Sequence, residues 1–226
     1  MKKLSELFHE CAWDAPYVEA GEDVDYAFVE EGDNLYIYFQ GSSSVTDWVR
    51  NFLFKQKPYK GMEIPYEVHG GFLAAWKEVE DIVIDKILEK KDKWEYRWKH
   101  ITVVGYSHGA ALAGLCHECV WYWRPDLRES GFEGYGFEAP RFYGGLHVKK
   151  ALKERWERFT VVRTNGDLVT HCPPVLFGFC HVGGMLKVKG DTGLAPRKWY
   201  IPRCIKSHYP EVVYDALLRF EEAVGA

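Results

Sequence analysis

The sequence predicts an α/β fold with a mostly parallel central sheet flanked by helices. Short runs of β-branched and aromatic residues alternate along it with longer segments whose apolar residues recur at helical spacing. Its 226 residues are 47% hydrophobic and 16% aromatic, enough to bury the core of one domain. No repeat or low-complexity segment interrupts this alternation. We therefore expect a single domain over residues 1–226.

A helix and a hairpin are expected first. The opening segment MKKLSELFHECAW has the pattern of an amphipathic helix. Residues 24–30 and 35–39 are typical of strands, and the EGDN between them is rich in turn-forming residues. A long helix is then predicted in GGFLAAWKEVEDIVIDKILEKK, because its apolar residues fall on one face: Phe72, Trp76, Val79, Val83, Ile84 and Ile87.

Strands and helices alternate in the rest of the chain. A buried strand is expected at 101–104, before a helix of small and apolar residues. The segment GYGFEAP predicts a further strand, LHVKKALKERWERF a helix, and FTVVRTNGD a strand that ends in an acidic loop. Two strands, around 185–188 and 198–201, are expected before a last helix, PEVVYDALLRFEEAV. This alternation is typical of parallel strands.

Charge and composition exclude several classes of protein. The net charge is −4 and the basic residues are spread among acidic ones, so no nucleic-acid partner is expected. The first residues lack the apolar stretch of a secretory signal, and no run approaches the roughly 20 apolar residues that cross a bilayer. We therefore expect a soluble, cytoplasmic protein with reduced thiols. The CHEC at 116–119 has no second ligand pair at zinc-site spacing, so no metal is expected there.

The segment VVGYSHGAALAGL places Ser107 at a turn from a strand to a helix. Gly105 and Gly109 flank it in the pattern G-x-S-x-G. In this pattern the glycines remove side chains that would clash where the chain reverses sharply around a strained nucleophile. Glycines beside a serine also occur in plain turns, but a strand before the motif and a helix after it favour a nucleophile.

A serine nucleophile needs a base, usually a histidine oriented by a carboxylate. In α/β-hydrolase folds the acid and then the histidine follow the serine, at loops beyond the carboxyl ends of strands. Asp167 meets this rule, although an aspartate in a surface turn is the alternative. His208 is the preferred base because it follows the last expected strand and opens the last helix. His171 is less suitable because it lies only four residues past Asp167, so one loop would have to supply both the acid and the base. His181 is less suitable because a structural hydrogen bond would explain its presence between the acid loop and the last strands.

The tetrahedral intermediate of acyl transfer needs backbone N–H donors. His108, directly after the nucleophile, is expected to supply one. In FQGSSS, Gly41 lets Ser42 bring its N–H and its hydroxyl near the substrate, although a plain turn is the alternative. A short amphipathic helix is predicted at 45–54, which either seals the core or covers an acyl-chain cleft as a lid. Its apolar stripe consists of Val45, Trp48, Val49, Phe52 and Leu53.

Together these motifs resemble the class 3 lipase family, which includes secreted fungal triacylglycerol lipases and feruloyl esterases. The resemblance extends from about residue 24 to residue 208. It rests on YFQGSSSVTDWVRNF, VHGGF, VVGYSHGAALAGL, GFEAPRFYGG, NGDLVTHCPP and FCHVGG. It implies an α/β-hydrolase fold with a mobile lid over 45–54. The site residues that it implies are a triad and an oxyanion hole: Ser107, Asp167 and His208, with Ser42 and His108.

By this resemblance the protein cleaves carboxylic esters of lipids through an acyl-Ser107 intermediate, without a metal or cofactor, in transient contact with a lipid–water interface. A short-chain, aryl or feruloyl-type esterase is the alternative. A catalytically silent lipid-binding protein is a third reading, against which the complete set of site residues argues. The sequence departs from the family at Gln40, where an arginine is usual, so an ion pair that orients the oxyanion loop is absent or replaced.

Overall fold

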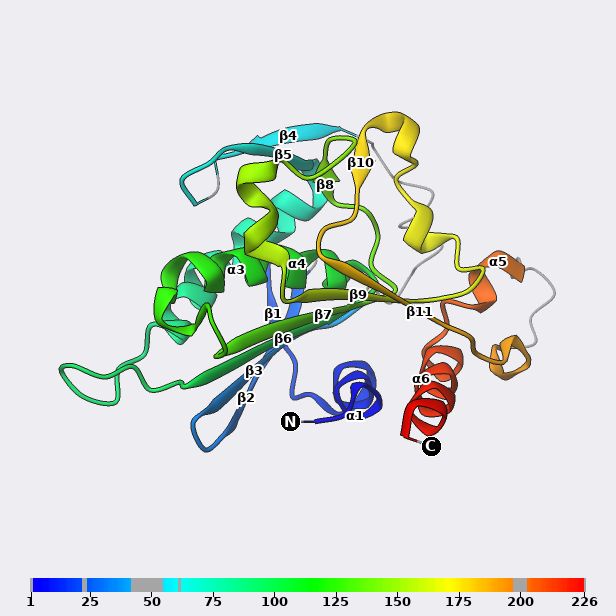
Figure 1. The fold of residues 1–226 in the computed structure, drawn as a ribbon, viewed down its shortest axis with the longest axis horizontal. Coiled ribbons are helices and arrows are strands. Elements are labelled where there is room, and N and C mark those ends of the chain that lie inside the picture. Colours follow the sequence, from blue (N-terminus) through cyan, green and yellow to red (C-terminus); the bar gives the residue numbers. More distant parts are fainter. Residues whose placement is uncertain (1, 22–23, 42–54, 61, 197–202, 226) are drawn as a thin grey trace.

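The computed structural model describes residues 2–21, 24–41, 55–60, 62–196 and 203–225. Strands β3, β6, β7, β9 and β11 of the central sheet are parallel, and β1 and β2 extend one edge in antiparallel fashion (Figure 1). This arrangement confirms the predicted α/β fold. The seven strands lie in this order: β1 (Val18–Ala20), β2 (Val24–Glu31), β3 (Asn34–Phe39), β6 (His100–Tyr106), β7 (Phe132–Phe137), β9 (Phe159–Thr164) and β11 (Gly184–Val188).

The predicted hairpin is confirmed, since β2 and β3 pair in antiparallel register with Phe28 opposite Ile37. The strand expected around 185–188 is β11, which pairs with β9. The strand expected at 198–201 lies outside the described residues.

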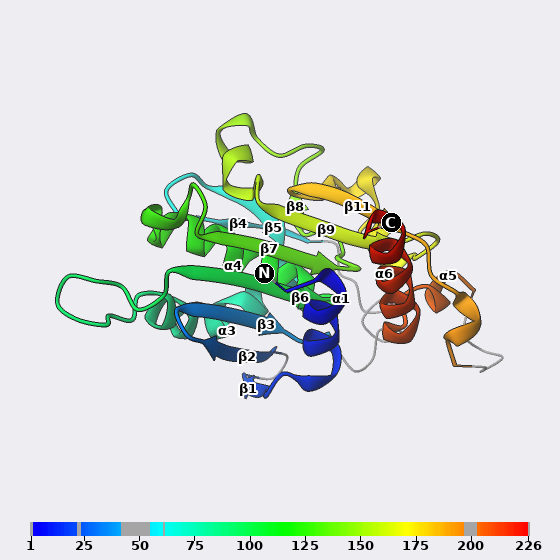
Figure 2. The same cartoon turned by 60° about the horizontal axis from the view of Figure 1, so that its bottom comes forward.

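Helices cover both faces of the sheet (Figures 1 and 2). On one face lie α3 (Gly70–Ile87) and α4 (His108–Trp123), and on the other α1 (Leu4–His9) and α6 (Pro210–Gly225). The predicted long helix ends at Ile87 rather than four residues later, and Ile84 on its apolar face is only half-buried. None of the helices within the described residues is long and apolar enough to cross a membrane.

The helix predicted in LHVKKALKERWERF is wrong in length and type. The structure has a 3₁₀-helix, η3 (Lys150–Trp156), in its place. A 3₁₀-helix repeats every three residues, which brings Leu152 and Arg155 to the same buried face. The shorter elements of the described chain are η1 (Glu10–Asp14), η2 (Pro125–Leu127), η4 (Val169–His171), η5 (Val175–Phe177), η6 (Thr192–Leu194) and α5 (Arg203–Lys206).

A second, antiparallel sheet lies above α4 in Figure 1 and was not predicted. Its strands, in spatial order, are β10 (Phe179–Cys180), β8 (Tyr143–Gly144), β5 (Tyr66–His69) and β4 (Gln56–Tyr59). A buried polar network joins this sheet to α4 and η3. Arg155 donates to Glu118 and, at 2.7 Å, to the carbonyl oxygen of Met62, while the Tyr66 hydroxyl donates to Glu118.

Candidate active site

Ser107 occupies a sharp turn between the carboxyl end of β6 and the first residue of α4. Its backbone has φ 55° and ψ −120°, a conformation that non-glycine residues rarely adopt. The Ser107 N–H donates to the carbonyl oxygen of Phe137 on β7 at 2.9 Å. A Cβ at Gly109 would lie 2.2 Å from the carbonyl oxygen of Phe39, and one at Gly105 would lie 2.2 Å from that of Gly109. The two glycines therefore let α4 begin in direct contact with the ends of the strands.

His208 joins Ser107 to Asp167 through its two ring nitrogens. Its Nε2 lies 2.8 Å from Ser107 Oγ, and its Nδ1 lies 2.7 Å from Asp167 Oδ2. All three side chains are buried, Ser107 being 2% exposed. Because an ionised carboxylate only accepts hydrogen bonds, the network assigns the proton to Nδ1 and leaves Nε2 to accept from the serine.

Residues at the ends of β6 and β9 hold His208 in place. The Tyr106 hydroxyl donates to the carbonyl oxygen of His208, and the two rings stack with centroids 5.4 Å apart. The Thr164 hydroxyl donates to the carbonyl oxygen of Ser207 at 2.7 Å. These contacts hold the chain entering α6 above the carboxyl ends of the strands, where Ser107 and Asp167 lie.

Asp167 is held in its ionised form. Burial alone would raise its pKa, but the neighbouring His208 and the hydrogen bonds that the carboxylate receives outweigh burial and lower the pKa below its ordinary value. One of these bonds comes from the Val169 N–H, 2.9 Å from Oδ1. Asp167 can therefore orient His208 and stabilise an imidazolium.

The other two downstream histidines bond to backbone carbonyls of the loop that follows β9. His171 Nδ1 lies 2.9 Å from the carbonyl oxygen of Asp167, and His181 Nε2 lies 2.9 Å from that of Thr170. Burial lowers the pKa of His181 to about 4, so its ring is neutral at pH 7. The structure thus brings His208, and neither of these two, to Ser107.

The predicted oxyanion donors are only partly within the described chain. His108 is the first residue of α4, so its N–H lies at a helix N-terminus beside Ser107, where the helix dipole favours an anion. Gly41 also approaches Ser107, since a Cβ at Gly41 would lie 3.2 Å from Ser107 Cβ. The backbone N–H of Gln40 donates to the carbonyl oxygen of Asp25 at 3.0 Å. Several predicted residues lie outside the described ranges: Ser42, Val45, Trp48, Val49, Phe52 and Leu53.

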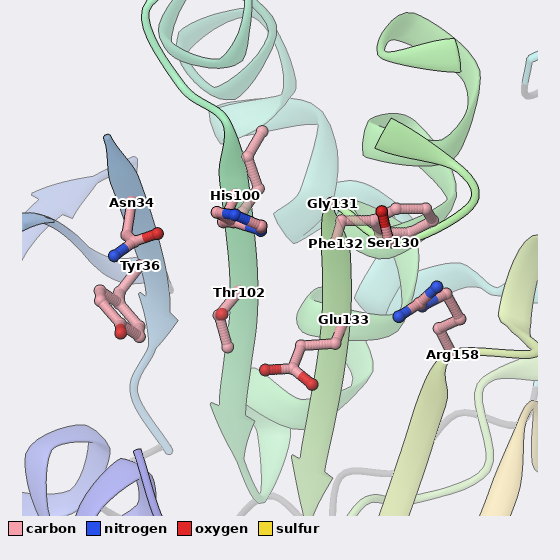
Figure 3. Close-up of a pocket in the computed structure, with 10 residues that line it drawn as sticks. Asn34, Tyr36, His100, Thr102, Ser130, Gly131, Phe132, Glu133 and Arg158 are labelled. Atoms are coloured by element: carbon pink, nitrogen blue, oxygen red, sulfur yellow. The ribbon is translucent and has the colours of Figure 1, made fainter. Parts of the chain in front are cut away.

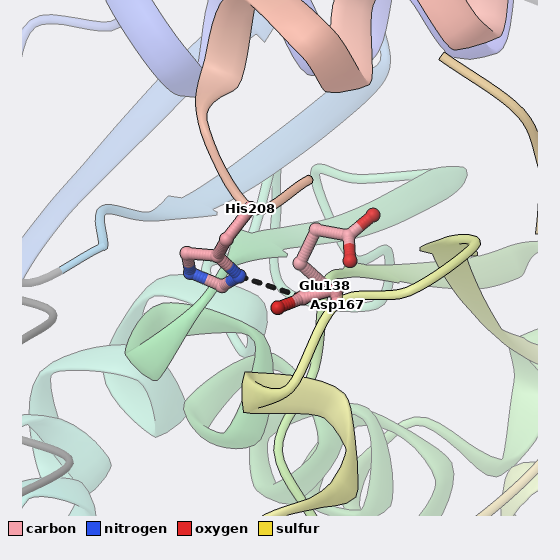
Figure 4. A group of neighbouring side chains, drawn as sticks. All are labelled: Glu138, Asp167 and His208. Atoms are coloured by element: carbon pink, nitrogen blue, oxygen red, sulfur yellow. Dashed lines mark hydrogen bonds and ion pairs between the residues drawn. The ribbon is translucent and has the colours of Figure 1, made fainter. Parts of the chain in front are cut away.

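The structure adds one side chain that the sequence reasoning missed. Glu138 follows β7 directly, is fully buried and has φ 52°. One ligand atom each of Glu138, Asp167 and His208 lie within 4.8 Å of one another (Figure 4). A cation here would compete with the short bond between His208 Nδ1 and Asp167 Oδ2, so hydrogen bonding explains the cluster better than coordination. The sequence offered one signal for Glu138, its position directly after a predicted strand.

A separate pocket of about 340 Å³ lies at the opposite ends of the strands (Figure 3). It is lined by Asn34 and Tyr36 of β3, His100 at the start of β6, and Glu133 of β7. Ser107 follows the other end of β6, roughly 20 Å away at 3.3 Å per residue. This pocket is therefore remote from the Ser107, His208 and Asp167 group.

A family model described as lipase (class 3) matches residues 36–177 of the chain. The chain belongs to the class 3 lipase family. The lipase of Rhizomucor miehei is 28% identical to it over 196 residues, covering 76% of this chain and 50% of that lipase. A secreted mono- and diacylglycerol lipase of Fusarium solani is 29% identical over 150 residues, covering 65% and 41% respectively. The chain thus spans half or less of the length of these two family members.

Solved structures of lipases share the fold. One, described as a triacylglycerol lipase whose catalytic centre is a serine protease triad, superposes with a TM-score of 0.65 at 24% identity. The Rhizomucor miehei triacylglyceride lipase superposes with a TM-score of 0.61 at the same identity. Each alignment covers 77% of this chain and 67% of the other. These likenesses confirm the α/β-hydrolase fold that the resemblance implied.

Proposed function

We propose that the protein is a serine hydrolase that cleaves carboxylic esters of lipids. The observation on which this rests is His208, which bridges Ser107 Oγ at 2.8 Å and Asp167 Oδ2 at 2.7 Å. This is the arrangement in which a histidine takes the proton of a serine nucleophile while a carboxylate fixes its tautomer. Membership of the class 3 lipase family supports an ester as the substrate.

The reaction proceeds through an acyl-enzyme. Ser107 Oγ attacks the carbonyl carbon of the ester while its proton passes to His208 Nε2. The tetrahedral oxyanion accepts a hydrogen bond from the backbone N–H of His108. The second predicted donor, Ser42, lies outside the described residues. The carbon–oxygen bond to the alcohol then breaks, and the departing oxygen takes the proton from His208. Water attacks the acyl-Ser107 with the same base and releases the carboxylic acid.

An exposed apolar turn supports contact with a lipid surface. The loop that begins at Asp167 continues into η5, where Leu176 is 96% exposed, Phe177 54% and Val175 45%. The Gln56 side chain of β4 donates to the carbonyl oxygens of Phe177 and Gly178, at 3.1 and 2.9 Å. Three neighbouring exposed apolar side chains on an anchored turn are typical of a contact surface. A lipid substrate forms a surface with water, and this lipid–water interface is the partner that we propose for the turn.

An ester series of graded acyl length tests the proposal. We expect hydrolysis of long-chain glycerides presented as emulsions, and its loss in Ser107→Ala with the fold intact. Matched assays use each ester below and above its solubility limit, with the exposed Ser130→Ala as the control variant. Turnover restricted to short-chain or aryl esters would replace the lipase assignment with an esterase. Turnover of no ester by the wild type would contradict both and favour a silent lipid-binding protein.

A further inference from the structure

Glu138 lies beside the proposed triad, and its carboxyl group has an uneven environment. Its Oε1 accepts a hydrogen bond from the Thr164 N–H at 2.6 Å. Its Oε2 is buried and receives no hydrogen bond from the described residues. Figure 4 shows the carboxyl group next to Asp167, with His208 on the other side of the aspartate. Two carboxyl groups therefore share one dry site beside a single imidazole.

Both carboxyl groups cannot be ionised there. Like charges a few ångströms apart in a buried site force one of the two to hold a proton. Asp167 is favoured as the anion, because His208 Nδ1 and the Val169 N–H both donate to it. Glu138 has one donor, so the proton belongs on Glu138. A proton on Oε2 also gives that buried oxygen an O–H to donate.

We propose that Glu138 is a neutral carboxylic acid whose O–H donates to Asp167, making it a positioning residue for the aspartate that orients His208. This proposal rests on the proposed function, since it assigns Asp167 its catalytic part. The bond fixes the carboxylate from the side opposite His208. Glu138 itself touches neither Ser107 nor the ester.

The groups around Glu138 agree with this protonation. Burial raises the pKa of Glu138 well above its ordinary value, and repulsion from Asp167 raises it further. The titratable neighbours come from three other parts of the chain: Asp167 after β9, His208 just before α6, and Tyr106 at the end of β6. Burial likewise holds the Tyr106 hydroxyl neutral by raising its pKa far above the usual range.

The first test compares kcat and KM of Glu138→Gln and Glu138→Ala on one soluble ester. The amide of Gln supplies an N–H in place of the O–H, so we expect kcat within about threefold of wild type. The Ala variant should lose about 10- to 100-fold in kcat with KM little changed, the usual effect of losing a hydrogen bond to a charged group. If the Ala variant does not fold, Glu138→Gly takes its place in the comparison, because glycine adopts the positive φ of this position without strain. Equal losses in folded Gln and Ala variants would overturn the proposal.

The second test measures the free energy of unfolding of wild type and Glu138→Gln against pH. The unfolded glutamate releases its proton near pH 4.5, whereas the folded one keeps it to much higher pH. The folded state then binds more protons above pH 4.5, so the wild type must lose stability relative to Glu138→Gln as pH rises. A flat difference, or a wild type that gains relative stability as pH rises, would mean an ionised Glu138 and would overturn the proposal.

The two tests separate this inference from the proposed function. A wild type that hydrolyses no ester refutes the proposed function, yet the stability difference still reports where the proton lies. An active wild type with a flat stability difference refutes the neutral Glu138 alone. Loss of kcat in Glu138→Ala with rescue in Glu138→Gln, together with the predicted pH slope, supports both.

Discussion

At the scale of single residues, the sequence indicated Ser107, Asp167 and His208 because each has a local signature. The serine has its flanking glycines, and the acid and the base follow it at strand ends. The structure brings all three into one hydrogen-bonded chain. Glu138 also follows a strand, but that position alone does not distinguish it from other polar residues at strand ends. Glu138 is part of the site because Asp167, in the loop after β9 and almost 30 residues later in the chain, lies against it. A local sequence pattern cannot predict a contact between residues so far apart.

The first prediction separates the histidines. His208→Ala should lose about 10⁴-fold or more in kcat, since loss of a triad member leaves only binding and the oxyanion hole. His171→Ala should keep most of its activity, because this exposed side chain bonds to a carbonyl oxygen. Steady-state kinetics on a soluble ester decide between them. An active His208→Ala, or an inactive but folded His171→Ala, would show that the base is a different histidine.

At the scale of elements, alternating strands and helices were predictable because each is long enough for its residues to show a recognisable pattern. The helices α3 and α6 show an apolar face, whereas β6 and α4 show runs of β-branched or small apolar residues that are buried on all sides. The second sheet shows no such pattern, because β8 and β10 have two residues each and β4 and β5 only four. Tertiary contacts hold it in place, among them the bond from the Tyr66 hydroxyl of β5 to Glu118, which also pairs with the buried Arg155. Arg155 reaches this pair from η3, whose buried residues include Leu152 and Trp156.

The second prediction tests that pair. Arg155→Met removes the partner of Glu118 and should lower the free energy of unfolding by about 3–5 kcal/mol, because a buried charge is left unpaired. Lys153→Met, at an exposed position of the same helix, should change it by less than about 0.5 kcal/mol. Urea unfolding measures both. The double variant Arg155→Met with Glu118→Met should recover part of the loss, and an unchanged Arg155→Met would show that the network does not hold the second sheet.

At the scale of the whole molecule, the two faces of the sheet differ in what covers them. The second sheet lies on the face covered by α3 and α4, and the turn η5 leads into its strand β10, whereas α1 and α6 close the opposite face (Figure 1). The apolar turn and the loop bearing Asp167 form one continuous segment. We therefore expect the molecule to approach a lipid surface with this side.

The third prediction concerns that approach. Leu176→Ser should reduce hydrolysis of an emulsified ester several-fold, because it removes the most exposed apolar side chain of η5, and apolar area is worth about 25 cal/mol per Å² at a lipid surface. Turnover of a soluble ester should not change. Val224→Ser, an exposed apolar position on α6, is the matched control and should affect neither substrate. Equal effects of Leu176→Ser on both substrates would place the lipid contact elsewhere.

The measurement that tests the central claim most directly is covalent labelling with a fluorophosphonate, followed by mapping of the modified residue. If Ser107 is the activated nucleophile, it should react with the reagent stoichiometrically. The label should then map to the segment VVGYSHGAALAGL. Ser107→Ala and His208→Ala should abolish labelling, whereas Ser130→Ala should leave it unchanged. A label on any other serine, or a folded wild type that resists the reagent, would contradict the assignment of Ser107 as the nucleophile.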